Sequence, residues 1–187
     1  MGTGVADAMT HKPFLRSLGG EAKKRGDYAF NVQDNVIELG FKSYESPYVS
    51  DATGFHEGLW HFDCGELFLL QPATGRYLEI NLAPNGAWWS CVFTDVRQRA
   101  ADIMPPQVEV WSDSVTEAGW SAGFRLPMVE VERCLGSSKG LSGNITLILG
   151  GCPDRQVTLE NLHSVAKLGA VDFHQPQEWL TLSDLQT

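Results

Sequence analysis

The sequence lacks long apolar runs and a surplus of basic residues, and each absence excludes a class of protein. No stretch of about 18 or more apolar residues occurs, so no membrane-spanning helix is predicted. Lys and Arg number 14 against 23 Asp and Glu, for a formal net charge of −9. Phosphate neutralisation needs excess Lys and Arg on one face, and the short basic cluster at residues 23–25 is typical of a solvated turn. We therefore expect neither a membrane nor a nucleic acid as a partner.

Several catalytic and targeting motifs are also missing. The sequence contains no P-loop, no Gly-x-Ser-x-Gly and no Gly-x-Gly-x-x-Gly. Its four cysteines include no Cys-x-x-Cys pair, which favours buried free thiols. The first residues lack the charged and apolar segments of a signal peptide. The chain as given is therefore expected to be cytoplasmic, unless an export leader has been removed.

The composition predicts one folded domain. Hydrophobic residues make up 43% and charged residues 20%, as in ordinary globular proteins, so the chain can bury a sizeable core. Residues 1–22 mix small and polar positions without a sustained period, which predicts an irregular N-terminal arm. We expect residues 23–187 to form a single domain.

From Asp27 onward, short alternating runs separated by turn residues predict strands. Asp34-Asn35 and Asn85-Gly86 indicate hairpin turns, whereas residues 45–58 indicate a long loop and Val129–Leu135 one or two helical turns. The strands are expected at residues 28–32, 36–44, 63–70, 77–83, 87–94, 108–115, 120–126, 144–149 and 156–162. This spacing predicts an all-β fold, an antiparallel β-sandwich of the jelly-roll type.

The strand that begins at Tyr77 separates into two faces. Leu78, Ile80 and Leu82 share one face, whereas Tyr77, Glu79 and Asn81 share the other. The first set is typical of a core and the second of a hydrogen-bonding surface. The polar face is therefore the candidate site.

An aromatic residue and a carboxylate residue precede this strand in the sequence. Trp60 follows the long loop, and Glu66 lies on the next predicted strand. Sugars are bound by flat rings that stack on the apolar face of a pyranose and by planar polar groups that bind its hydroxyls. The alternative is that Trp60 is a core ring and that Glu66 pairs with Arg76 or Arg97.

Three motifs, in this order, resemble family 9 carbohydrate-binding modules. They are LWHFDCGELFLLQPATGRYLEINLAPNGAWW at residues 59–89, WSAGFRLP at residues 120–127 and FHQP at residues 173–176. The resemblance covers residues 25–182 and implies a β-sandwich related to the DOMON group, in which two Trp rings clamp a terminal sugar. It implies Trp60 as one stacking wall, with Glu66 and Asn81 as polar partners.

The sequence departs from this family pattern at two places. Gly123 stands where the family has a glutamate, and no Trp occurs between Glu160 and Asp172, where the second wall is expected. His163, Phe173 and Trp179 are the candidate replacements for that wall.

The sequence thus predicts non-catalytic binding of a mono- or oligosaccharide, with no catalytic residues and no metal site. A hydrolase encoded separately is a further expected partner. The predicted ligand-binding residues are Trp60, Glu66, Glu79, Asn81, Arg97, Phe173 and Trp179.

Three alternatives stay open. Glu66 and Glu79 on adjacent strands would be the acid and base of a glycoside hydrolase, which needs carboxyl groups about 5–9.5 Å apart. Relatives of this fold bind haem through Met and His, for which Met104, Met128 and His61 are available. No cofactor is expected otherwise, except structural calcium held by the loop that Asp51 and Asp63 flank.

Overall fold

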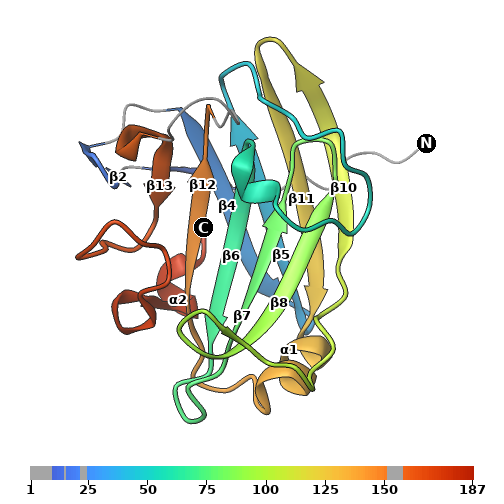
Figure 1. Ribbon diagram of the computed structural model, residues 1–187, viewed down its shortest axis with the longest axis vertical. Coiled ribbons are helices and arrows are strands. Elements are labelled where there is room, and N and C mark those ends of the chain that lie inside the picture. The colour runs from blue at the N-terminus through green and yellow to red at the C-terminus, as the bar shows by residue number, and fades with distance from the viewer. Residues whose placement is uncertain (1–9, 15, 22–24, 151–157) are drawn as a thin grey trace.

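The computed structural model describes residues 10–14, 16–21, 25–150 and 158–187 (Figure 1). Within these residues the strands form two sheets, one of five and one of nine strands, and every named strand pair is antiparallel. The predicted antiparallel β-sandwich is therefore confirmed.

The five-stranded sheet forms the back layer in Figure 1. Its order is β1 (Lys12–Pro13), β4 (Gly26–Gln33), β5 (Val36–Ser43), β11 (Gly119–Pro127) and β10 (Glu109–Thr116). The β4–β5 hairpin turns at Asp34 and Asn35, whose φ angles of 52° and 61° are those of a type I′ turn. The predicted turn lies at these two residues.

The nine-stranded sheet forms the front layer. Its order is β3 (Gly20–Glu21), β2 (Arg16–Ser17), β13 (Leu162–Ser164), β12 (Ser142–Ile148), β6 (Cys64–Leu70), β7 (Tyr77–Leu82), β8 (Trp88–Asp95) and β9 (Gln98–Arg99), with β14 (Leu180–Thr181) also paired to β12. The predicted meander is the β6–β7–β8 unit.

Helices are few and short. They are α1 (Met128–Leu135), α2 (Leu182–Leu185) and 3-10 turns at Leu59–His61, Leu159–Asn161 and Pro176–Glu178. The helix predicted at Val129–Leu135 is α1, which ends at Gly136 with a φ of 86°. Within the described chain, no helix is long and apolar enough to cross a membrane.

The strand predicted over residues 156–162 differs in position. Gln156 and Val157 lie outside the described residues, residues 159–161 form a 3-10 turn, and β13 begins only at Leu162. The alternation of apolar and polar residues could not distinguish the 3-10 turn from a strand, because both elements are only a few residues long here.

The described part of the predicted arm pairs with both sheets. β1 pairs with β4, whereas β2 pairs with β13. Between them, Phe14 is 1% exposed and its ring packs against Tyr28 and His163, with centroids 5.2 and 6.1 Å away. Residues 12–14 and 16–21 therefore connect the two layers.

The main core fills the space between the layers. Leu67, Leu78 and Ile80 of the front sheet meet Phe41 and other buried side chains of the back sheet. Gly65 also faces this core: a Cβ there would lie 2.5 Å from the Phe41 ring, so the ring packs directly on the β6 backbone. The core thus occupies one face of the β6–β7–β8 unit and leaves the other face outside the sandwich.

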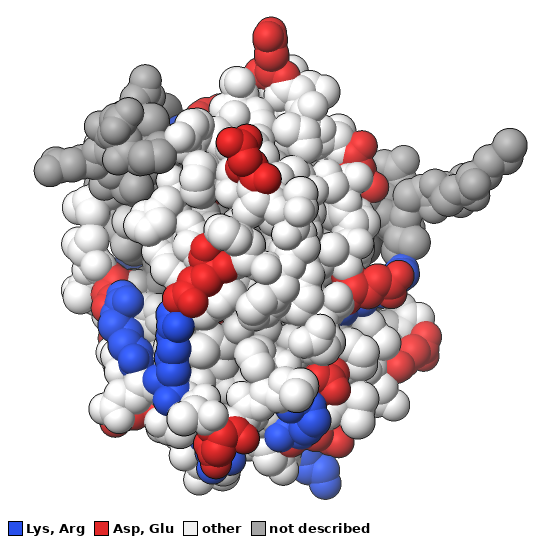
Figure 2. All heavy atoms as spheres, turned by 45° about the vertical axis from the view of Figure 1, so that its right-hand side comes forward, with Lys and Arg blue, Asp and Glu red and all other residues white. Residues whose placement is uncertain are grey.

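Charged side chains are interspersed on the face of the molecule that Figure 2 shows. Among the described residues on that face, Asp and Glu lie between and beside Lys and Arg, and no continuous basic surface is visible. Three of the four cysteines, Cys64, Cys91 and Cys134, are buried free thiols, and Cys152 lies outside the described residues.

Candidate functional site

The outer face of the β6–β7–β8 unit forms the floor of the candidate site. Strand register aligns Glu66 on β6 with Asn81 on β7 and Trp89 on β8. The next residue pair on the same face of β6 and β7 is Phe68 with Glu79. Because side chains alternate, these residues point away from the Leu67, Leu78 and Ile80 core. Carboxyl groups and aromatic rings therefore share one floor.

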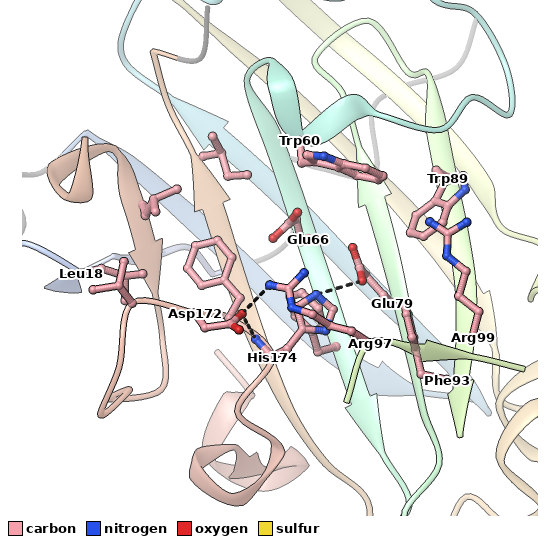
Figure 3. A pocket seen from close by; sticks show the side chains of 15 residues that line it. Leu18, Trp60, Glu66, Glu79, Trp89, Phe93, Arg97, Arg99, Asp172 and His174 are labelled. Carbon is pink, nitrogen blue, oxygen red and sulfur yellow. Dashed lines mark hydrogen bonds and ion pairs between the residues drawn. The ribbon is translucent and has the colours of Figure 1, made fainter. Parts of the chain in front are cut away.

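A cavity of about 390 Å³ lies over this floor (Figure 3). Trp60, from the 3-10 turn at Leu59–His61, lies above Glu66 and Glu79, with Trp89 beside it. Three segments distant in sequence complete the walls. They contribute Leu18, Arg97, Arg99, Val171, Asp172, Phe173 and His174.

The two tryptophan rings meet edge to face. The centroids of Trp60 and Trp89 are 5.4 Å apart at an interplanar angle of 69°. The Arg99 guanidinium lies 5.2 Å from the Trp89 ring and forms an ion pair with Glu57. Trp89 is 4% exposed, whereas Trp60 is half-buried. Trp60 is therefore the more exposed of the two tryptophan rings that line the cavity.

Two carboxyl groups are buried at the floor. Glu66 and Glu79 are 3% and 5% exposed. Thr146 Oγ1 donates a hydrogen bond to Glu66 Oε2 at 2.6 Å. Burial, followed by the charge of Glu79, raises the pKa of Glu66 to about 8, and burial raises the pKa of Glu79 to about 7. Near neutral pH the pair therefore holds a proton and can both donate and accept hydrogen bonds.

His174 contacts this pair without neutralising it. Its Nε2 lies 3.6 Å from Glu79 Oε2, and burial, followed by the charge of Arg97, lowers the pKa of His174 to about 4. The imidazole is consequently neutral at physiological pH. Arg97 and Arg99 act on Glu79 from the rim, where their charges oppose the rise of its pKa.

Tyr77 joins two segments of the rim. Its hydroxyl accepts a hydrogen bond from Arg97 N at 2.9 Å and lies 2.8 Å from His174 Nδ1. The Arg97 side chain forms an ion pair with Asp172 at 2.7 Å, and Asp172 also accepts from His174 N at 2.9 Å. These contacts hold residues 172–174 against the turn between β8 and β9, which fixes the lower wall of the cavity in Figure 3.

The structure brings together five of the seven residues that the sequence singled out. Trp60, Glu66, Glu79, Arg97 and Phe173 all line the cavity. Their roles in binding stay predictions.

The other two predicted residues, Asn81 and Trp179, are not among those that line the cavity. Asn81 is fully buried on the floor, and neither the nitrogen nor the oxygen of its amide has a hydrogen-bond partner of good geometry. Its amide is nevertheless close enough to Glu79 to oppose the rise in the pKa of that carboxyl group. Trp179 is 7% exposed, donates from Nε1 to Phe173 O at 3.2 Å, and packs on Phe68 and Tyr77. Trp179 therefore occupies a packing position beside the cavity, and its predicted role as a ligand-binding residue stays a prediction.

Sequence reasoning missed Trp89, Arg99, Asp172 and His174 as cavity residues. For Trp89 a signal exists: the Asn85-Gly86 hairpin sets the register that places Trp89 opposite Asn81, on the polar face. Arg99 and Asp172 depend on how distant loops fold over the sheet, for which the local pattern gives no signal. His163, a candidate for the second wall, is fully buried beside Phe14 and does not line the cavity.

The residues proposed for haem and calcium are not grouped at the cavity. Met104 and His61 are exposed, and Met128 packs against the main core. Asp63 is buried and accepts a hydrogen bond from Gly150 N at 2.8 Å, whereas Asp51 is exposed. Among the described residues, no group of three or more His, Cys, Asp or Glu is placed to hold a metal ion.

Comparison with known proteins identifies similarity at the level of the fold. No family model matches the chain, and no curated protein matches its sequence significantly. A solved structure from Bacteroides uniformis ATCC 8492, named a "putative carbohydrate-binding protein", is 17% identical and superposes with a TM-score of 0.69, covering 94% of this chain and 86% of that one.

A second solved structure is a family 9 carbohydrate-binding module from Caldicellulosiruptor kristjanssonii in complex with glucose. It is 11% identical, with a TM-score of 0.60, and the match covers 97% of this chain and 86% of that one. The chain has the fold of a family 9 carbohydrate-binding module. The resemblance predicted from the three sequence motifs is thereby confirmed for the fold.

Proposed function

We propose that the protein binds a mono- or oligosaccharide, without catalysis, in the cavity beneath Trp60. The observation that carries this proposal is the combination of a half-buried tryptophan, Trp60, with two buried carboxyl groups in one cavity of about 390 Å³. Small-molecule sites usually occupy about 300–1,000 Å³ and combine apolar walls with a few polar groups.

Trp60 supplies the stacking surface from one side. A sugar ring clamped between two parallel rings needs about 7–8 Å between them, twice a van der Waals contact. Trp60 and Trp89 are 5.4 Å apart and edge to face, and Arg99 lies over Trp89. The sugar therefore stacks on Trp60 alone, and Trp89 supports that ring from its side.

The floor and rim supply the polar contacts. Sugar hydroxyl groups donate and accept hydrogen bonds, so they need partners of both kinds. Glu66 and Glu79, with a proton retained between them, offer both, and the guanidinium groups of Arg97 and Arg99 offer donors. In the comparisons, the Caldicellulosiruptor kristjanssonii module of the same fold is in complex with glucose, which supports a sugar as ligand.

The position of the carboxyl pair favours binding over hydrolysis. Glycosidases place two carboxyl groups on either side of the scissile bond. Here Glu66 and Glu79 rise from neighbouring strands of one floor, so both face a bound sugar from the same side (Figure 3). Aryl glycosides with the wild-type protein should give no turnover. Turnover that disappears in Glu66→Gln would instead establish a hydrolase.

The test of binding is calorimetric titration with glucose, xylose, cellobiose and xylobiose. We expect Trp60→Ala to weaken binding about two- to twelvefold, because a stacked ring contributes about 0.5–1.5 kcal/mol. Trp111→Ala is the matched control, since Trp111 is also half-buried but lies on β10 of the opposite sheet. Equal affinities of the two variants, or no binding of any saccharide by the wild type, would contradict the proposal.

A further inference from the structure

A second groove adjoins the cavity. It has a volume of about 770 Å³ and lies between β2 and the segment 164–171. Leu18 and Val171 line both the groove and the cavity, so the two hollows meet at these side chains. In Figure 3, Leu18 lies at the side of the cavity away from Trp89.

The groove continues the cavity across the strands of the front sheet. From β6, which carries Glu66, the order runs through β12 and β13 to β2. Three strand spacings of about 4.8 Å give a span of about 14 Å, longer than one pyranose ring. A ligand that fills both hollows therefore has several sugar units.

The groove carries positive charge in an otherwise acidic protein. Arg16 and Lys167 line it, and no Asp or Glu is among the described residues that do so. Neither cation forms an ion pair with a described residue. Asp172, at the junction, is already paired with Arg97 at 2.7 Å. Because charges are screened over about 8 Å at physiological salt, distant acidic residues that contribute to the net charge of −9 act only weakly on Arg16 and Lys167.

The wall of the groove is held in place by its own hydrogen bonds. Ala170 N donates to Gln175 Oε1 at 3.1 Å, and Gln175 Nε2 donates back to Ala170 O at 2.9 Å. Ser164 Oγ donates to Ala166 O at 2.8 Å at the other end of the segment. The groove thus exists before a ligand arrives.

We propose that the cavity and the groove form one cleft for an acidic oligosaccharide, in which a neutral unit stacks on Trp60 and a hexuronate unit is held by Arg16 and Lys167. This inference rests on the proposed sugar binding at Trp60. The carboxylate of a hexuronate is opposite in charge to the two cations, and the span of the cleft exceeds one sugar unit.

The experiment compares neutral oligomers with acidic counterparts. Xylotetraose is titrated against the same oligomer with one 4-O-methylglucuronate branch, and cellotetraose against its C6-oxidised form, at 20 and 300 mM NaCl. We expect the acidic oligomer of a pair to bind about fivefold more tightly at low salt, from two exposed ion pairs, and to lose this advantage at high salt.

Two double variants separate the possible outcomes. Arg16→Gln with Lys167→Gln should abolish the preference for the acidic oligomer and leave monosaccharide binding unchanged. Lys42→Gln with Lys139→Gln removes the same charge from exposed sites elsewhere and should change neither. Equal affinity for acidic and neutral oligomers, or a preference that survives loss of Arg16 and Lys167, would overturn the acidic cleft. If the wild-type protein binds neither monosaccharides nor oligomers, the proposed function itself is overturned.

Discussion

Replacing Glu66 by glutamine should stabilise the protein, and more so as the pH rises. The side chain is 3% exposed, and its pKa is raised from 4.5 to about 8, first by burial and then by Glu79. A carboxyl group with a raised pKa favours folding when protonated, so its contribution is fully present below about pH 4.5 and is lost as the pH rises through about 8. Over the three units between pH 5 and 8, at about 1.4 kcal/mol per unit, the wild type loses up to about 4 kcal/mol relative to Glu66→Gln.

The assay is urea unfolding at pH 5, 6, 7 and 8, followed by tryptophan fluorescence. The difference between variant and wild type reports on Glu66 and its coupling to Glu79. The contributions of His163 and His174, whose pKa values are lowered by burial, cancel because they make both proteins less stable as the pH falls. Glutamine keeps an oxygen that accepts the hydrogen bond from Thr146. Glu117→Gln, at an exposed turn, is the control and should leave the profile unchanged. A constant difference between Glu66→Gln and wild type at all four pH values would refute the reasoning.

Two further substitutions test the packing that positions the floor. Gly65→Ala should lower the free energy of unfolding by about 1–3 kcal/mol, because the new Cβ would lie 2.5 Å from the Phe41 ring. Gly40→Ala is the control, since a Cβ at Gly40 meets no atom within 4 Å. Equal urea midpoints for the two variants would contradict this prediction. Asn144→Ala should cost about 1–3 kcal/mol by removing the buried amide that accepts from Ala166 N at 3.0 Å. A loss no larger than that of Asn31→Ala, at a half-buried position, would show that this buried amide contributes little.

Local pattern predicted the meander and its two faces well. The alternation around Tyr77 placed Leu78 and Ile80 in the core and Glu79 on the outer face, as the structure has them. This works because side chains of a strand alternate strictly and one face of each sheet must be buried. The turn at Asp34-Asn35 could be predicted for a similar reason, since few residues adopt positive φ angles there.

The rest of the site depends on contacts between segments distant in sequence. Trp179 is a residue type that often binds sugars. It follows the 3-10 turn at Pro176–Glu178, and its ring packs on Phe68. Arg99 reaches the cavity because it lies over Trp89 and pairs with Glu57 of the long loop. Neither position follows from spacing along the chain, because each is set by tertiary packing.

The central claim is that a saccharide stacks on Trp60, and nitrogen–proton correlation spectra of the indole groups test it most directly. Six tryptophans give six indole N–H signals, assigned by single substitutions. Addition of glucose or cellobiose should shift the signals of Trp60 and Trp89, which meet edge to face, and leave that of Trp111 on the opposite sheet unchanged. Shifts confined to Trp111, or a spectrum that no saccharide changes, would contradict the account.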